Sequence, residues 1–314
     1  MTYFNVSFQY SENVFCANIA AAEKESDVAA MYSGYEWCSI APATEGDVET
    51  ARKKGMPIVD CPPVEDVAPE KSITFTPDSV TVDNGNGNVS TVDRRSVPTR
   101  VKDFEKYFYV SHGNIKLKSN DETLFIIWSL PARITCPYRT EHCSEKCYAV
   151  KAETARPDVL PSRMRNFEFS KKPEFVPYMI RLLELKMQYA RGRKIVVRVH
   201  ESGDFYNVFY ARKWLEIARH FVGENIVFMA YTKSLPFFKG ENVPENFVIR
   251  ASLWDDTTPE LREESALYPV YTALSRAEMD ALPEDSFHEC RCSDCATCGK
   301  CWDKSVRNII CEIH

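Results

Sequence analysis

Several features that would assign the 314-residue chain to a familiar class are missing. No apolar run approaches the roughly 18 residues that a membrane-spanning helix needs, so we expect no membrane segment. The first residues, Met1 to Val6, lack the basic and apolar regions of a secretory leader, and we therefore expect a cytoplasmic protein. The net charge of −6 argues against broad affinity for nucleic acid, although it leaves room for a local basic groove.

Three common catalytic and nucleotide-binding motifs are also absent. The chain contains no Gly-x-Gly-x-x-Gly, no Gly-Lys-Ser/Thr loop and no Gly-x-Ser-x-Gly. Nucleotide hydrolysis and serine-hydrolase chemistry therefore have no support in the sequence. The composition is 44% hydrophobic and 27% charged, which is ordinary for a globular protein. The length fits one large domain or two of usual size.

What the chain does have is cysteine, with 12 residues in total. Three lie within 136–147 and five within 290–301. Without a leader, clustered thiols indicate metal binding or redox chemistry rather than a disulfide scaffold. The four others are scattered, and we interpret them as ordinary thiols: Cys16, Cys38, Cys61 and Cys311.

The middle of the chain alternates apolar runs with helical spacing. We expect strands over 123–130, 194–200, 225–231, 246–252 and 268–272, and helices over 174–190 and 207–222. This order is typical of βαβ units, so the predicted fold class is α/β, a partial (β/α) TIM-like barrel with a parallel sheet. Such sheets place their chemistry in the loops after the strands.

The regions on either side of this barrel are harder to interpret. Residues 1–110 form an irregular N-terminal region, with a helix expected over 17–31. Within 72–95, the run Asn-Gly-Asn-Gly between Val/Thr segments permits a hairpin, but we favour a loose, exposed segment. The barrel itself is expected over 111–280, and a cysteine-rich metal-binding extension over 281–314.

The first cysteine cluster has the spacing C-x6-C-x3-C, formed by Cys136, Cys143 and Cys147. Three thiolates in one short loop suit one face of a [4Fe-4S] cluster and leave one iron open. Zinc is the competing metal, with His142 as a fourth ligand, although adjacent residues rarely bind one ion together. Three unligated thiols are the remaining alternative.

The second cluster holds five cysteines in a short segment: Cys290, Cys292, Cys295, Cys298 and Cys301. The last four are spaced C-x2-C-x2-C-x2-C, which approaches the runs of ferredoxins and also the knuckles of zinc sites. We predict a metal site here, with iron–sulfur and zinc both open. A cysteine of this segment completing the first site is a further alternative.

The residues after the next strands are candidate ligand contacts. These are the Ser202-Gly203-Asp204 turn, then Lys233, Arg250, Ser252 and Asp255. An ordinary turn explains Ser-Gly-Asp equally simply, and a solvated surface position is the alternative for the rest. His200 we interpret as a hydrogen-bonded core residue rather than a ligand or a base. A basic stretch around Arg156, Arg163 and Arg165 we interpret as a solvated helix face.

A cysteine triplet directly after the first strand of such a barrel resembles the radical S-adenosylmethionine superfamily. Spacing there is C-x3-C-x2-C with an aromatic residue before the last cysteine, whereas here Tyr148 follows it. A closer resemblance, over about 113–302, is to an uncharacterised family of bacteriophage gene products. It is carried by Gly113-Asn114-Ile115-Lys116-Leu117, Ser129-Leu130-Pro131-Ala132, Thr135-Cys136-Pro137, Cys147-Tyr148-Ala149, Arg156-Pro157, Arg165-Asn166, His200-Glu201-Ser202-Gly203-Asp204-Phe205 and the late Cys-x2-Cys-Trp.

The superfamily resemblance implies a radical enzyme. Its members bind S-adenosylmethionine through the open iron and form a 5′-deoxyadenosyl radical that abstracts hydrogen from the substrate. It implies that Ser202, Gly203 and Asp204 cradle the methionine group and that the C-terminal cysteines carry an auxiliary cluster. We retain the alternative of a non-catalytic, metal-stabilised phage protein that binds a host protein or nucleic acid in the host cytoplasm. The substrate and the oligomeric state do not follow from the sequence.

Overall fold

A computed structural model describes residues 2–11, 14–25, 28–29, 38–53, 58–60, 73–75, 79–83, 89–93, 96–283, 286–291 and 294–313. The chain divides into two compact units, Met1–Glu70 and Lys71–His314. This division falls well before the boundary near residue 110 that the sequence analysis places.

The first unit is a small sheet with one helix. Its strands are β1 (Thr2–Ser11), β2 (Val14–Ala22), β3 (Cys38–Pro42) and β4 (Ile58–Asp60), in the order β3-β1-β2-β4, with helix α2 (Glu45–Lys53). Strand β1 pairs antiparallel with β2 and β3, and β4 joins β2 in parallel. One face buries Phe4 and Val6, and the other face packs Ile19 against α2.

The helix predicted over 17–31 is wrong over 17–22, where the chain is part of β2. Alanine favours a helix by only a few tenths of a kcal/mol per residue, and tertiary pairing outweighs that preference. Here Ala20 pairs with Phe4 of β1. Ala20 and Ala22 then join the same small core as Phe4, as alternation along a strand requires.

A three-stranded antiparallel sheet opens the second unit, made of β5 (Ile73–Phe75), β6 (Ser79–Asp83) and β7 (Val89–Asp93). Asp83 at the end of β6 pairs with Val89 at the start of β7, so the two strands are antiparallel neighbours, as in a hairpin. The preference for a loose segment over 72–95 is therefore wrong for these strands. The Asn-Gly residues between them lie outside the described residues.

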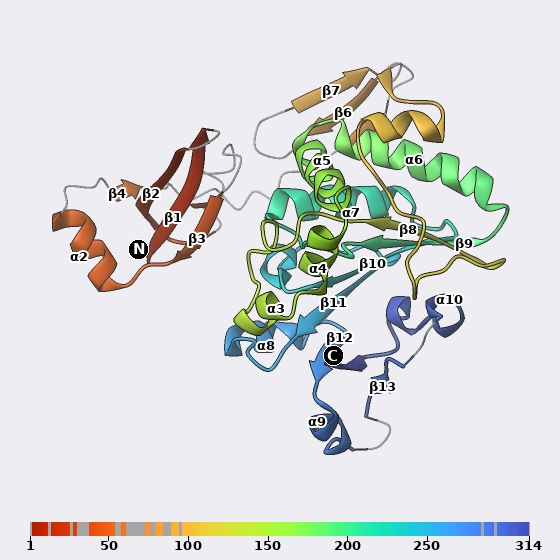
Figure 1. Ribbon diagram of the computed structural model, residues 1–314. Coiled ribbons are helices and arrows are strands. Elements are labelled where there is room, and N and C mark those ends of the chain that lie inside the picture. The colour runs from red at the N-terminus through yellow and green to blue at the C-terminus, as the bar shows by residue number, and fades with distance from the viewer. Residues whose placement is uncertain are drawn as a thin grey trace. The chain divides into compact units, whose positions relative to one another are not determined.

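The main sheet has seven parallel strands and is the predicted partial barrel (Figure 1). They are β8 (Thr123–Trp128), β9 (Lys194–Val199), β10 (Ile226–Thr232), β11 (Phe247–Leu253), β12 (Val270–Leu274), β13 (His288–Glu289) and β14 (Asn308–Glu312). Their order is β13-β14-β12-β11-β10-β9-β8, so β8 and β13 are the outermost strands, and Ser111 bridges Ile127 at the edge of β8. All five strands predicted from the sequence are present, each within two residues of its expected start.

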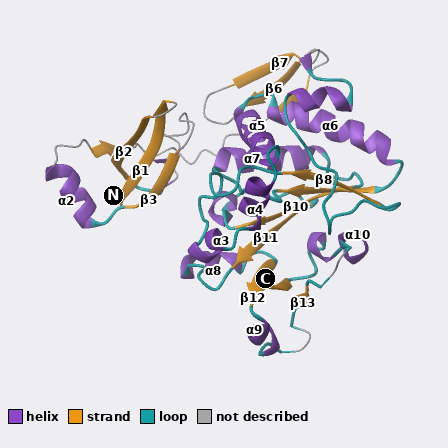
Figure 2. Cartoon of the chain, in the orientation of Figure 1, coloured by secondary structure: helices purple, strands orange, loops and turns teal. Residues whose placement is uncertain are grey.

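Helices flank this sheet (Figure 2). They are η2 (Val101–Lys106), α3 (Glu141–Glu145), α4 (Tyr148–Ala155), α5 (Val159–Lys171), α6 (Phe175–Ala190), α7 (Val208–His220), η3 (Leu235–Phe238), α8 (Pro259–Ser265), α9 (Arg276–Asp280), α10 (Cys295–Cys298) and η4 (Lys300–Trp302). The predicted helices match α6 and α7, and the Asn207 side chain caps α7 by accepting from Tyr210 N. None of the described helices is long and apolar enough to cross a membrane.

The two faces of the sheet are covered by different parts of the chain. One face carries the large core, in which Trp128 of β8 packs against Phe175 of α6 and Trp214 of α7. The opposite face, which we call the concave face, carries a second apolar cluster that includes Phe125 of β8 and Trp302 of η4, with ring centroids 5.6 Å apart.

Residues 281–314 are thus not a separate extension. They supply two strands of the sheet, β13 and β14, and they cover its concave face with α10 and η4. Arg250 of β11 fixes this cover, because its guanidinium donates four hydrogen bonds of 2.7–2.8 Å to carbonyls between Lys300 and Val306.

Candidate metal centre at the strand ends

The loop with Cys136, Cys143 and Cys147 follows β8 and runs into α4. Local hydrogen bonds shape it: the Thr135 hydroxyl donates back to a carbonyl of the same loop, and Thr140 Oγ1 accepts from Cys143 N, which begins α3. Cys147 is the N-cap residue of α4. The three cysteines are therefore held on a short, folded loop rather than on an extended one.

The three thiols lie near one another. The Cys136 thiol is within electrostatic range of Cys143, Cys147 and the Asp204 carboxylate, and Cys143 is within range of Lys233. None of the three forms a disulfide. Burial raises the pKa of both Cys136 and Cys143, so these thiols stay protonated unless a metal cation replaces the proton.

The spacing of these thiols bears on the choice of metal. Two sulfurs on one zinc ion, each about 2.3 Å from it, lie at most about 4.6 Å apart. Among described residues, only His142, Asp255 and Asp256 form a group of three ligand atoms within 4.8 Å of one another. In a cubane each thiolate binds a different iron, which lets the sulfurs stand farther apart. The donor set of the loop therefore fits a cluster better than a single ion.

Gly203 lets the end of β9 approach the cysteine loop. Its φ is +79°, a region that favours glycine. A Cβ atom there would lie 2.5 Å from Thr135 Oγ1 and 2.6 Å from Leu130 Cβ. Backbone bonds cross the same contact, from Leu130 N to Ser202 O at 2.8 Å and from Asp204 N to Thr135 O at 3.2 Å. The predicted turn thus holds the loop against the second strand of the sheet.

The Asp204 carboxylate joins the ends of β9 and β10. Its Oδ1 accepts from Thr232 Oγ1 at 2.5 Å and from Phe205 N at 2.8 Å, and its Oδ2 accepts from Lys233 N at 2.9 Å. Burial raises the pKa of Asp204, and these hydrogen bonds oppose that rise. Because a carboxylate has about four acceptor positions, one position on Oδ2 remains for a ligand.

Ser202, Lys233 and Ser252 lie in the same part of the sheet. The Ser202 hydroxyl is buried and has no hydrogen-bond partner among the described residues. Lys233 is 5% exposed, and its ammonium donates to Ser252 O at 3.1 Å and to Ser252 Oγ at 3.2 Å. Burial lowers the pKa of Lys233, and the nearby Cys143 and Asp204 oppose this by favouring its charged form.

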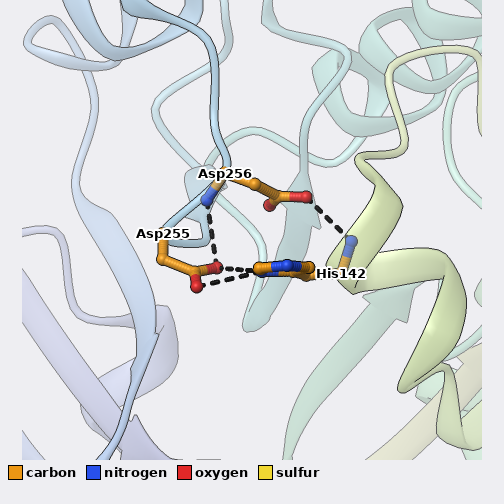
Figure 3. Close-up of side chains that lie close together, drawn as sticks. All are labelled: His142, Asp255 and Asp256. Atoms are coloured by element: carbon orange, nitrogen blue, oxygen red, sulfur yellow. Dashed lines mark hydrogen bonds and ion pairs between the residues drawn. The ribbon is translucent and has the colours of Figure 1, made fainter.

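Asp256, which was not predicted from the sequence, links the cysteine loop to the end of β11 (Figure 3). His142 N donates to Asp256 Oδ2 at 2.8 Å, and His142 Nδ1 lies 2.8 Å from Asp255 Oδ1. The Asp255 carboxylate raises the pKa of His142. His142 is thereby turned to carboxylates and not grouped with the three thiols. No motif marks Asp256, since the contact joins residues 114 positions apart.

Other predicted site residues have structural roles. His200 is buried, and its Nε2 lies 2.9 Å from the Tyr210 hydroxyl, which confirms the core interpretation. Arg250 points to the C-terminal cover rather than to the strand ends. In the basic stretch, Arg163 is buried and pairs with Glu153 at 2.8 Å, so the interpretation of a solvated face is wrong for this residue.

The C-terminal cysteines gather separately, against the concave face. Cys295 lies within electrostatic range of Cys301, Cys290 and Cys298. Cys298 Sγ is 3.6 Å from His288 Nε2. None of these cysteines is in a disulfide, and Cys292 lies outside the described residues.

Cys311 was interpreted as an ordinary thiol, yet it lies in β14 beside this group. Cys290 N donates to Ile310 O at 2.7 Å, which places Cys290 and Cys311 at matching positions of neighbouring strands. The Cys311 thiol accepts a hydrogen bond from Tyr271. In the sequence, Ile309 and Cys311 alternate as residues on one face of a strand do. That pattern does not show which residues of other strands lie beside them.

A comparison with known protein families gives a match. The family model described as Gene product 88 matches residues 108–304, more than half of the chain. No curated protein and no solved structure matches. The matched residues include the cysteine loop, the ends of β9, β10 and β11, and the C-terminal cysteine segment up to η4. The chain therefore belongs to the Gene product 88 family of bacteriophage gene products.

Proposed function

We propose that this chain is an iron–sulfur protein in which Cys136, Cys143 and Cys147 hold a [4Fe-4S] cluster with one open iron, and that it acts as a radical S-adenosylmethionine-like enzyme. The observation that carries the proposal is the meeting of three free thiols with Asp204 and Lys233 at the carboxyl edge of a parallel half-barrel. Ligand sites of parallel α/β sheets lie at this edge.

Charge balance supports the proposal. Lys233 is a buried cation that donates hydrogen bonds only to neutral acceptors of Ser252 among the described residues. A buried charge without an opposite charge is costly. Asp204 offsets part of it, and metal-bound thiolates of Cys136 and Cys143 would add further negative charge within range of the ammonium.

When bound, such a cluster supplies the electron that cleaves S-adenosylmethionine reductively. The chain's own residues supply the binding site. The Ser202 hydroxyl, which has no partner among the described residues, is free to bond a ligand. Asp204 keeps one acceptor position for an ammonium group. Lys233 and Ser252 supply a cation and a hydroxyl for a carboxylate or a ribose. Gly203 holds these groups against the loop.

The cluster is tested on the full chain, purified and reconstituted without oxygen. We expect absorbance near ~400 nm and loss of about four irons per chain in each of Cys136→Ala, Cys143→Ala and Cys147→Ala. Cys311→Ala is the matched control and should keep its iron. Equal iron in all four variants would contradict the assignment of this loop.

Catalysis is tested by adding S-adenosylmethionine to the reduced protein and measuring 5′-deoxyadenosine. The expected product appears with wild type and is lost with Cys143→Ala. If protein that holds the cluster forms no 5′-deoxyadenosine with any reductant tried, the proposed enzymatic activity is wrong. The second candidate function, described next, would then remain.

The second candidate is a non-catalytic, metal-stabilised protein that binds a host protein or nucleic acid. The specific observation in its favour is that Asp204 already accepts three internal hydrogen bonds, as a structural residue does. In that case the metal contributes to the stability of the fold. Removing iron would then lower the melting temperature, and no product would form from S-adenosylmethionine.

A further inference from the structure

The concave face of the sheet carries polar side chains that the function above does not use. Residues on this face alternate with core residues along each strand, and they include Arg198 of β9, Tyr231 of β10, Arg250 of β11 and Tyr271 of β12. Apolar residues usually fill such a covered face. Two arginines and two tyrosines there call for an explanation.

The two arginines are buried without carboxylate partners. Arg250 is fully buried, and its four hydrogen bonds go to main-chain carbonyls. Arg198 is 8% exposed, donates to His200 O at 3.1 Å and lies over the Tyr231 ring, 3.8 Å from its centroid. Among the described residues neither makes an ion pair with an acid. Two buried positive charges of this kind require a negative group nearby.

One of the C-terminal cysteines faces both arginines, and the exposed Asp303 carboxylate is within electrostatic range of Arg250 as well. Cys301 lies within electrostatic range of both Arg198 and Arg250. Arg250 also bonds the carbonyl of Cys301 itself, at 2.7 Å, so it positions the residue as well as facing its thiol. Asp303 offsets part of the charge of Arg250, but neutral thiols would leave Arg198 without a negative partner, whereas metal-bound thiolates would supply one to both arginines.

Tyr231 makes the contact expected of an outer-shell residue. Its hydroxyl donates to Cys301 Sγ at 2.6 Å, and its ring stacks on Tyr271 with centroids 4.4 Å apart and an interplanar angle of 18°. Hydrogen bonds to ligand atoms are a regular part of metal sites, because they orient the ligand and adjust its charge. Tyr271 instead donates to Cys311.

We propose that Cys290, Cys295, Cys298 and Cys301 bind a thiophilic metal as an anionic tetrathiolate centre on the concave face, charge-balanced by Arg198 and Arg250 and hydrogen-bonded through Tyr231. Zinc and an iron–sulfur cluster share this ligand chemistry, and because no three of these thiols lie within 4.8 Å of one another among the described residues, their spacing favours the cluster, as it does at the first loop. The centre fastens α10 and η4 to the sheet. It does not depend on the first cysteine loop, which lies at the strand ends.

The first experiment isolates this centre. In the full-length variant Cys136→Ala/Cys143→Ala/Cys147→Ala, elemental analysis after anaerobic reconstitution should find either one zinc or one cluster per chain. Zinc without acid-labile sulfide identifies the ion, and iron with sulfide identifies the cluster. Adding Cys295→Ala and Cys298→Ala should remove the metal. A triple variant that is folded by circular dichroism and holds no metal would overturn the proposal and leave the first site untouched.

The second experiment uses the two stacked tyrosines as a matched pair. Tyr231→Phe removes only the hydroxyl that donates to Cys301 Sγ. It should weaken metal retention against a chelator by about tenfold, which is the smaller effect typical of losing a hydrogen bond to a metal ligand. Tyr271→Phe removes the hydroxyl on Cys311, which is outside the proposed ligand set, and should leave retention unchanged. Both rings keep their packing, so a structural role alone would not separate them. Equal retention in the two variants would contradict the assigned ligands.

Discussion

The two cysteine-rich segments meet the same sheet in different ways. The first is a loop at the carboxyl edge, held by Gly203 and Asp204, and its neighbours are a lysine and several acids. The second lies across the concave face, and its charged neighbours are Arg198 and Arg250. The first leaves a hydroxyl and an acceptor position free, whereas in the second both arginines already bond to the protein itself. This difference favours a reactive centre at the edge and a structural one on the face.

The largest expected loss of stability comes from a change in the C-terminal segment that covers the concave face. Arg250→Gln removes a guanidinium that bonds four carbonyls, and leaves most of those buried acceptors without donors. We expect unfolding to become easier by roughly 3–5 kcal/mol. Urea titration measures it, with Arg307→Gln as control, because Arg307 is exposed and bonds a single carbonyl. Losses of similar size in both would mean that Arg250 does not anchor the cover.

The next effect belongs to the first region. Gly203→Ala adds a methyl group 2.5 Å from Thr135 Oγ1 at a positive φ, and should cost roughly 2–4 kcal/mol. Gly223→Ala has a similar φ of +88° but nothing within 4 Å, so it should cost only about 1–2 kcal/mol. Thermal unfolding of the two variants separates close approach from backbone strain. If they unfold alike, the contact between β9 and the loop is not tight.

A smaller change tests whether the regions are separate. Lys233→Gln keeps a donor toward Ser252 but removes the positive charge beside Cys143. We expect about tenfold weaker retention of iron in the first centre, about 1.4 kcal/mol, and no change in the second. Iron release to a chelator is measured in backgrounds that hold one centre each. Weaker iron retention in both centres would show that the two cysteine-rich segments form a single site.

The smallest expected change in the free energy of unfolding comes from a residue outside both cysteine-rich segments. It serves as a reference for the larger effects. His220 of α7 and Arg181 hold Glu184 of α6 and lower its pKa. A lowered pKa contributes stability that is present above the unfolded value of 4.5 and is lost as pH falls through the folded value. Because Glu184 is one-third exposed, Glu184→Gln should cost under about 1 kcal/mol at pH 7 and nothing at low pH. A loss that is constant from pH 7 to pH 3 would contradict this origin.

Much of the fold was predictable because its signals are local. Apolar runs predicted β8 to β12, and helical spacing predicted α6 and α7. The helix over 17–31 failed because pairing with β1 decides the state of residues 17–22. The place of β14 between β12 and β13 has no local signal either, since strand order depends on pairings far apart in sequence.

The site was predictable to a similar degree. Spacing alone grouped Cys136, Cys143 and Cys147, and the βαβ rhythm placed Asp204 and Lys233 beside them. The roles of Arg250, Asp256 and Cys311 could not be predicted, because each depends on a partner 20 to more than 100 residues away. A charged residue at a strand end looks the same in sequence whether it faces a ligand or the protein's own backbone.

The strand order also determines when each strand can pair while the chain is being synthesised. Strands β8 to β12 follow one another in the sheet as they follow in the chain, so each can dock as it leaves the ribosome. Strand β13 cannot, because its only neighbour in the sheet is β14, which is made later. Until then Cys290, directly after β13, has no strand to hold it, whereas η4 can already bind Arg250 on the concave face. A nascent chain paused before Asn308 is thus the form in which Cys290 is not yet held beside the other C-terminal cysteines.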